Sequence, residues 1–366
     1  MEQRRLLKSG VLRKMLAVTA AVLTVCAGVT PAGAAAEKVS FAYPTNINLS
    51  NAPTLMAIGM GYFKEEGLDV DVLFFQGSAV MLPQLTQKHL TFGWMSPEVL
   101  ITASQPGRAA LPTKMFYNGI YLSPYELVVR EDSPIKSLAD LKGKKIGVGA
   151  MSWANLAITK TMLKDEGLEL QKNYELLPVG VGATAFRALQ DGSIDALNLF
   201  DTFHTQMENN GTALRRLPVQ DQYRQLFSNG WIAHEDTLRD RPEMVVKFSR
   251  AAAKGVVACN ANPEACVKNF WNLYPGTKPS QGTQEKNLAD AVRIVKVRLA
   301  TMIPQDGVGR MGYYTEQSLK DYVKVLYTGG QIPTDQIPVD SLYTNEFVKK
   351  TNDFDVNAVI AAAKAR

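Results

Sequence analysis

Phe63-Lys64-Glu65-Glu66-Gly67-Leu68-Asp69-Val70 is followed one hundred residues later by Leu163-Lys164-Asp165-Glu166-Gly167-Leu168-Glu169-Leu170. Both copies have the pattern of a helix that ends at a glycine and leads into a strand, and a favoured helix ending alone would explain them. The match continues, however, at a nearly constant offset: Gln76-Gly77-Ser78 corresponds to 179–181, and the link at 87–93 corresponds to 190–196. Two similar α/β units in one chain predict two lobes that face a cleft.

The apolar pattern predicts alternating strands and helices in both units, followed by a helical segment. The predicted strands are 38–42, 70–75, 90–94, 114–118, 125–130, 145–148, 174–178, 196–199 and 230–234. The predicted helices are 55–66, 79–88, 97–104, 153–166, 183–191, 242–261, 263–274, 281–301, 315–328 and 356–363. This predicts an α/β fold in which each lobe is a parallel-rich sheet flanked by helices.

The same pattern predicts where the lobes begin and end. Lobe 1 is expected to comprise residues 38–119 and 235–366, which include the helical C-terminal part, and lobe 2 residues 121–231. Since no long flexible linker is present, we expect the hinge at the two crossings, 119–124 and 230–236.

Residues 1–34 have the composition of a signal peptide. Five basic residues precede the apolar run Met15 to Val29, and the small residues Ala32-Gly33-Ala34 follow it. A membrane anchor is the alternative, but the run is short for a span and no second such run occurs in the sequence. We therefore predict a periplasmic protein, and the pair Arg4-Arg5 leaves open whether export follows the Sec or the twin-arginine route.

Removal of this segment changes the charge of the chain. The full sequence has a formal net charge of +5 at pH 7, and residues 1–34 contain five basic residues and one acidic residue, which leaves +1. This balance gives no basis for a nucleic-acid partner or an acidic membrane partner. The hydrophobic fraction of 46% and the charged fraction of 20% are ordinary for a soluble protein with sizeable cores.

Cys259 and Cys266 are the two cysteines that remain after residue 34. In an oxidising compartment they can form a disulfide across the break between two predicted helices, where Asn262 and Pro263 lie. Free thiols are the alternative, because the spacing alone does not fix the geometry. A metal site is not expected, since the three histidines are scattered along the chain.

Three stretches of the sequence resemble one family. They are Ala57 to Val70, Val128 to Val148, and Gly192-Ser193-Ile194-Asp195-Ala196. They resemble the periplasmic solute-binding proteins of ABC importers, in the group that binds sulfonates, nitrate, taurine and thiamine precursors. The resemblance covers roughly residues 39–270 and implies a periplasmic binding protein type II fold. It also implies two lobes that close on a small organic molecule and hand it to the permease of an ABC importer. We expect a monomer without a cofactor.

Seven loops at predicted strand ends are candidates for the ligand site. In open α/β sheets a ligand lies beyond the carboxyl ends of the strands, where helix N-termini present free backbone N–H groups. The loops are 44–51, 77–78, 94–96, 117–118, 149–153, 180–183 and 198–201. They supply the candidate ligand-binding residues Asn51, Gly77, Ser78, Trp94, Ser96, Asn118, Ser152, Trp153, Asn198 and Asp201.

These candidates also have structural interpretations that stay open at this point. The serines and Asp201 could serve only as helix caps, and the asparagines could stabilise loop turns. Trp94 and Trp153, one in each unit, could enclose a flat or apolar ligand or pack in the core. Because no arginine or lysine falls in the seven loops, we expect a neutral or zwitterionic ligand with an aromatic or heterocyclic portion rather than a sulfonate.

The sequence has no enzyme signature. It lacks a G-x-S-x-G elbow, a P-loop and a metal-binding helix, and no nucleophile has an obvious base partner. The family has a distant enzymatic cousin that makes the thiamine pyrimidine, and this chain lacks the histidine and cysteine cluster of that enzyme. We therefore expect a binding protein and not an enzyme. A periplasmic sensor that signals to a membrane receptor is the alternative, because a receptor and a permease would dock on the same exposed faces.

Overall fold

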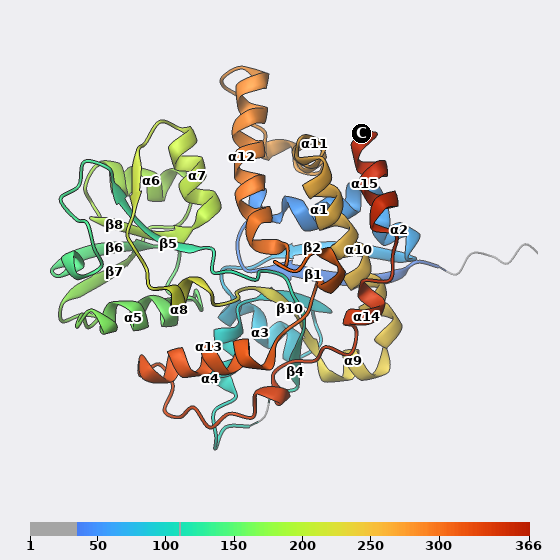
Figure 1. The fold of residues 1–366 in the computed structure, drawn as a ribbon, viewed down its shortest axis with the longest axis horizontal. Helices are drawn as coiled ribbons and strands as arrows, with labels where there is room; N and C mark the ends of the chain where they lie inside the picture. Colours follow the sequence, from blue (N-terminus) through green and yellow to red (C-terminus); the bar gives the residue numbers. More distant parts are fainter. Residues whose placement is uncertain (1–34, 110) are drawn as a thin grey trace, which may run out of the picture. The chain divides into compact units, whose positions relative to one another are not determined.

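A first five-stranded sheet is formed by strands between residues 37 and 118 and by one later strand, as seen in the computed structural model, which describes residues 35–109 and 111–366. Its strand order is β2-β1-β3-β10-β4 (Figure 1). The strands are β1 (Glu37–Tyr43), β2 (Leu68–Phe74), β3 (Phe92–Met95), β4 (Thr113–Asn118) and β10 (Gly230–His234). β1 is parallel to β2 and β3, whereas β10 is antiparallel to β3 and β4.

A second five-stranded sheet has the order β7-β6-β8-β5-β9. Its strands are β5 (Tyr125–Arg130), β6 (Lys144–Val148), β7 (Tyr174–Pro178), β8 (Ala196–Phe200) and β9 (Leu214–Arg216). β6 is parallel to β7 and β8, and β5 is antiparallel to β8 and β9. The two sheets therefore have the same arrangement, with one antiparallel strand inserted beside the third parallel strand.

The sequence repeat corresponds to this repeated arrangement. Gly67 and Gly167 both have a φ of 73°, which L-residues rarely adopt, and each amide donates to the carbonyl three residues earlier at 2.9 Å. The predicted fold class, two parallel-rich sheets flanked by helices, is confirmed. The exact lobe boundaries stay a prediction, although the returning strand β10 is part of the first sheet. The predicted signal peptide lies outside the described residues.

The helices mostly agree with the sequence pattern. They are α1 (Ala52–Met60), α2 (Tyr62–Glu65), α3 (Ser78–Thr86), α4 (Pro97–Ala103), α5 (Leu156–Asp165), α6 (Ala183–Gln190), α7 (Asp201–Asn209), α8 (Asp221–Arg224), α9 (Glu235–Asp240), α10 (Pro242–Ala261), α11 (Pro263–Leu273), α12 (Gln284–Met302), α13 (Glu316–Thr328), α14 (Val348–Thr351) and α15 (Val356–Lys364). The predicted helix 55–66 is divided at Gly61, and the predicted helix 153–166 begins only at Leu156. None of the described helices is long and apolar enough to cross a membrane.

The C-terminal helices pack against elements of both units. α10 contacts α1, and its Phe248 lies 5.4 Å from Phe41 of β1 and 5.0 Å from Trp231 of β10 between ring centroids. α13 contacts α5 of the second unit, and α12 contacts both α7 and α11 (Figure 1). α12 is thus placed between elements of the two units, which matters for the site below.

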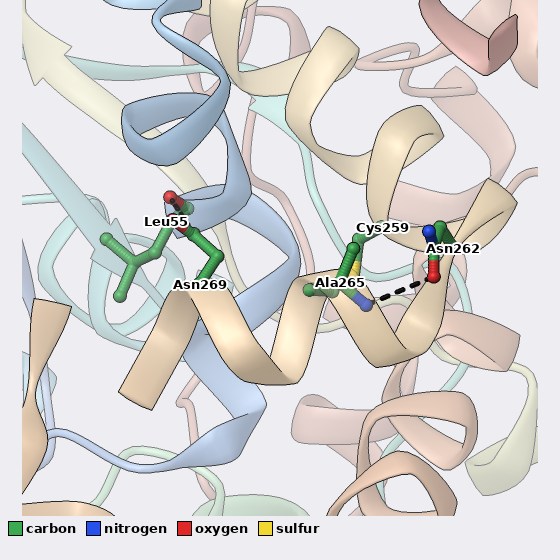
Figure 2. The surroundings of a disulfide bond; sticks show 6 residues. Leu55, Cys259, Asn262, Ala265 and Asn269 are labelled. Atoms are coloured by element: carbon green, nitrogen blue, oxygen red, sulfur yellow. Dashed lines mark hydrogen bonds between the residues drawn. A yellow bond between two sulfur atoms is a disulfide. The ribbon is translucent and has the colours of Figure 1, made fainter. Parts of the chain in front are cut away.

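A disulfide joins the end of α10 to the start of α11 (Figure 2). The Cα atoms of Cys259 and Cys266 lie 5.0 Å apart. Between them the Asn262 side chain accepts a hydrogen bond from the Ala265 amide at 3.0 Å and so caps α11. Asn269 on the same helix donates to the Leu55 carbonyl of α1 at 3.2 Å. The disulfide therefore fixes the turn that seats α11 against α1.

We predict that Cys259→Ser with Cys266→Ser lowers the free energy of unfolding by about 2–3 kcal/mol. The reason is that the short closed loop removes this much chain entropy from the unfolded state. Urea unfolding followed by circular dichroism measures the difference, and wild-type protein treated with a reductant should match the double variant. Equal stability of oxidised and reduced wild type would contradict the prediction.

Candidate functional site

A cavity lies where the two sheets and α12 meet. It encloses about 580 Å³, part of which is open to solvent. Its wall includes loops of the first sheet, the crossing at 119–124, Asn229 just before β10, loops of the second sheet and one residue of α12. The lining residues are Tyr43, Pro44, Thr45, Ser50, Asn51, Gly77, Ser78, Trp94, Ser96, Ile120, Pro124, Tyr125, Trp153, Ala154, Asn155, Phe200, Asn229 and Arg298.

The two predicted tryptophans form opposite parts of this wall. Trp94 at the end of β3 packs against Trp231 with ring centroids 4.9 Å apart. Trp153 stacks on Phe200 at 5.7 Å with an angle of 25° between the ring planes. Each tryptophan thus both packs on its own sheet and lines the cavity, so the two interpretations made from the sequence are compatible. The cavity has an aromatic surface on both sides.

Three predicted polar residues line the cavity but have partners in the protein. Asn51 accepts from the Asn48 amide at 3.1 Å, and the Ser78 hydroxyl accepts from the Ser96 amide at 3.3 Å. The Ser96 hydroxyl donates to the carboxylate of Glu98, which lies behind the cavity wall. Burial raises the pKa of the Glu98 carboxyl above its ordinary value, and the Ser96 hydrogen bond opposes that shift. These side chains shape the wall while part of their hydrogen-bonding capacity is already used.

Two predicted asparagines do not line the cavity. Asn118 donates to the Tyr313 carbonyl at 3.3 Å and lines a separate hollow. Asn198 is fully buried, accepts from the Thr159 hydroxyl at 2.9 Å and donates to the Glu126 carbonyl at 3.1 Å. Both side-chain amides therefore connect elements of the fold by hydrogen bonds. The loops 117–118 and 180–183 contribute nothing to the lining.

Ser152 contacts the opposite loop. Its hydroxyl donates to the carbonyl of Gln76 at 2.6 Å, so a loop of the second sheet touches a loop of the first. A Cβ added to Gly77 would lie 2.8 Å from the Ser152 carbonyl oxygen, and Gly77 has a φ of +114°. The two loops therefore meet at van der Waals distance beside the cavity. Only a glycine allows this approach at position 77.

We predict that Gly77→Ala holds these loops apart. The radius of gyration should rise by on the order of 1 Å above the roughly 20 Å of a compact chain of this length. Small-angle X-ray scattering of the purified protein measures it.

Gly180→Ala is the matched control for Gly77→Ala. Gly180 occupies the corresponding position of the sequence repeat and also has a positive φ, but its added Cβ would meet no atom within 4 Å. The control should keep the wild-type radius of gyration. An unchanged radius in Gly77→Ala would show that this contact does not set the distance between the loops.

A buried ion pair lies at the side of the cavity. Arg298 of α12 donates from Nη2 to Oδ1 of Asp201 at 2.6 Å, and the two residues are 3% and 5% exposed. The guanidinium also lies 5.4 Å from the Phe200 ring. Burial raises the pKa of the Asp201 carboxyl above its ordinary value, and the charge of Arg298 opposes that shift. Asp201, predicted as a ligand residue, instead pairs with a lining residue.

Arg298 is a cavity residue that lies outside the seven predicted loops. A positive side chain does line the cavity, but it comes from α12, whose sequence reads only as a helix, and not from a strand-end loop. Its charge is balanced by Asp201, so the wall has no net charge from this pair. Tyr43, Tyr125 and Phe200 were also missed, although each adjoins or lies within a predicted loop or crossing.

We predict that Asp201→Ala lowers the free energy of unfolding by about 3–5 kcal/mol, because it leaves a buried guanidinium without its carboxylate. Asp201→Ala combined with Arg298→Met should be more stable than Asp201→Ala alone. Urea unfolding of the three proteins measures both differences. A single variant as stable as wild type would show that the pair is not a buried structural unit.

The fold and the cavity define the class of protein. Two sheets of this arrangement around a shared cavity are the fold of periplasmic binding proteins. The alkanesulfonate-binding protein SsuA from Xanthomonas axonopodis, solved with MOPS bound, superposes with a TM-score of 0.62 at 13% identity and covers 84% of this chain and 98% of its own. The family model described as NMT1/THI5 like matches residues 48–266, and the chain belongs to that family. The family resemblance stated from the sequence is confirmed.

Two curated relatives differ in activity. The riboflavin-binding protein RibY from Chloroflexus aurantiacus is 23% identical over 344 residues, which cover 89% of this chain and 94% of RibY. The 2'-hydroxybiphenyl-2-sulfinate desulfinase from Rhodococcus erythropolis is 32% identical over 165 residues, which cover 44% of this chain and 43% of the enzyme. The second match spans less than half of either protein, whereas the first spans nearly all of both.

Proposed function

We propose that this protein captures a small organic solute in the cavity between its two sheets and delivers it to an ABC importer. The observation that carries the proposal is the composition of the wall: loops of both sheets, the crossing at 119–124, Asn229 before β10 and α12 contribute side chains to one cavity. A ligand that contacts all of these elements would favour the arrangement in which they are close together, which a membrane partner can then recognise.

The proposed location is the periplasm. The signal-like segment at 1–34 and the disulfide between Cys259 and Cys266 support it, because disulfides persist in oxidising compartments. A permease is the proposed partner, as the family implies, and a membrane receptor that senses the loaded protein is the alternative. A pull-down with the membrane fraction, with and without ligand, distinguishes the two by the protein it recovers.

The proposed ligand has a flat apolar portion. Trp94 and Trp153 with Phe200 provide ring faces on the two sides of the cavity. The ion pair of Arg298 and Asp201 adds a polar group without adding net charge, which favours a neutral or zwitterionic compound.

The partial match to a desulfinase makes catalysis the competing function. Acyl or sulfinate chemistry through a covalent or acid–base route needs a nucleophile or a general acid within reach of the substrate. Among the residues that line the cavity there is neither a cysteine nor a histidine. Both cysteines in the described part of the chain are joined to each other between α10 and α11. The wall therefore lacks a cysteine nucleophile and a histidine base, although the Ser96 hydroxyl donates to the Glu98 carboxylate. The nearly full-length match to a binding protein, RibY, favours binding over turnover.

Thermal unfolding of the protein with a panel of compounds tests the proposed function. The panel contains riboflavin, lumichrome, aminopyrimidines, aromatic acids, amino acids, taurine and MOPS. A ligand at one hundred times its dissociation constant adds about 2.7 kcal/mol to the stability of the folded state, which shifts the midpoint measurably. Trp153→Ala should lose most of that shift if the ligand occupies this cavity. A shift that is fully retained in Trp153→Ala would place the ligand elsewhere.

Binding without consumption is the second readout. Chromatography of the compound after incubation should return it unchanged, whereas a desulfinase-like enzyme would convert a sulfinate such as biphenyl-2-sulfinate. If no compound in the panel shifts the midpoint, and unfolding of the purified protein releases no small molecule, solute capture is wrong.

A further inference from the structure

One cavity residue has an amide that the protein does not satisfy. Asn155 lies just before α5, is 2% exposed and lines the cavity. Neither its Oδ1 nor its Nδ2 has a hydrogen-bond partner within the described part of the protein. It also lines a second, adjoining pocket together with Tyr125 and Glu98. Asn155 therefore lines the proposed ligand site with both of its side-chain polar atoms buried and unpaired.

The neighbouring asparagines differ from Asn155 in this respect. Asn51 accepts from a backbone amide, and Asn229 accepts from the Ser228 hydroxyl at 3.0 Å. Asn198, on the strand that leads to the cavity, uses both ends of its amide within the fold. Burying an amide without partners costs free energy, and nearly all buried polar groups in proteins are satisfied. An unpaired donor and acceptor on one buried side chain thus indicates a partner that arrives from outside the protein.

The charged atoms nearby restrict what this partner can be. Arg298 uses Nη2 for Asp201, and within the described structure neither Arg298 Nε nor Asp201 Oδ2 has a partner. An anionic ligand would approach the Arg298 guanidinium, which is already paired with Oδ1 of Asp201. It would also approach Oδ2 of the same carboxylate, which repels an anion. A neutral group that offers a donor and an acceptor side by side would instead satisfy both atoms of Asn155, since a primary amide can donate and accept at once.

We propose that Asn155 is a specificity-determining residue that binds a cis-amide edge, meaning an adjacent C=O and N–H, on a flat lactam or imide ring. The ligand N–H donates to Asn155 Oδ1, and Asn155 Nδ2 donates to the ligand carbonyl. This inference rests on the proposed function and adds a chemical class to it. The aromatic walls hold the ring, and Asn155 selects its edge.

Asn155→Leu separates a ligand contact from a structural role. Leucine has a similar volume and no polar atoms, so the ligand-free variant should unfold at the same temperature as wild type or about 1–3 °C higher. Asn229→Leu is the matched control, because it makes the same change in the same cavity to an amide that has a protein partner. The control should unfold at a lower temperature than wild type.

Binding of riboflavin and lumichrome, both of which have an imide edge, is then measured by titration calorimetry. Asn155→Leu should weaken each by at least about tenfold, the loss expected when a pair of hydrogen bonds is removed. Riboflavin methylated at the imide nitrogen should bind wild type correspondingly more weakly, and the methyl group should have no further effect in Asn155→Leu.

The outcomes are distinct from those that test solute capture. If wild type binds MOPS or an aromatic acid but neither imide compound, the inference about Asn155 is overturned while capture of a solute stands. The inference is also overturned if Asn155→Leu destabilises the ligand-free protein as much as Asn229→Leu, or binds the imides as wild type does. If wild type binds nothing in the panel, the proposed function itself fails.

Discussion

Two antiparallel strand pairings determine where the cavity forms. β10 pairs with β3 so that Gly230 lies opposite Met95 and Trp231 opposite Trp94, while β5 pairs with β8 so that Tyr125 lies opposite Phe200. Each pairing places a crossing segment beside the end of a central parallel strand, which is where loops of α/β sheets hold ligands. Pro124, Tyr125 and Asn229 enter the cavity wall for this reason. The same segments that connect the sheets are thus part of the surface that a ligand would touch.

This arrangement explains which features the sequence could predict. The helix ends at Gly67 and Gly167 and the strands that follow them depend on local patterns, and they occur close to where the pattern indicated. The second predicted crossing, 230–236, instead begins with strand β10 of the first sheet. Some residues at strand ends could also be selected from the sequence, since Trp94, Ser96 and Trp153 line the cavity; that they bind a ligand stays a prediction. The orientation of a side chain at a strand end is decided by packing across the sheet, however. Asn198 turns toward Thr159 and Glu126, and Ser152 turns toward Gln76, for reasons that no local pattern contains.

Long-range pairing accounts for the remaining differences. Arg298 reaches the cavity because α12 packs beside α7, nearly one hundred residues earlier in the chain, and its partner Asp201 is the first residue of α7. An amphipathic helix gives no indication of which of its charged residues will face a cavity. The burial of both charges is tolerated because they are paired, and the pair leaves the wall close to neutral. The seven loops contain no basic residue, so the sequence did not predict the cation Arg298 in the wall. Because Asp201 pairs with Arg298, this cation adds no net charge to the wall, in agreement with the expected neutral site.

The cavity wall contains aromatic rings that can hold a ligand and polar groups that can select it. Ring faces such as those of Trp94, Trp153 and Phe200 accept many flat compounds, because stacking depends little on the substituents of a ring. Discrimination requires polar groups that are left unpaired when the wrong compound binds, since that loss is much larger than the loss of one apolar contact. Relatives with this fold include proteins named for riboflavin and for alkanesulfonates, so the sheets alone do not determine the ligand. In this chain, the unsatisfied amide of Asn155 and the neutralised Arg298 are the groups on which such discrimination would depend.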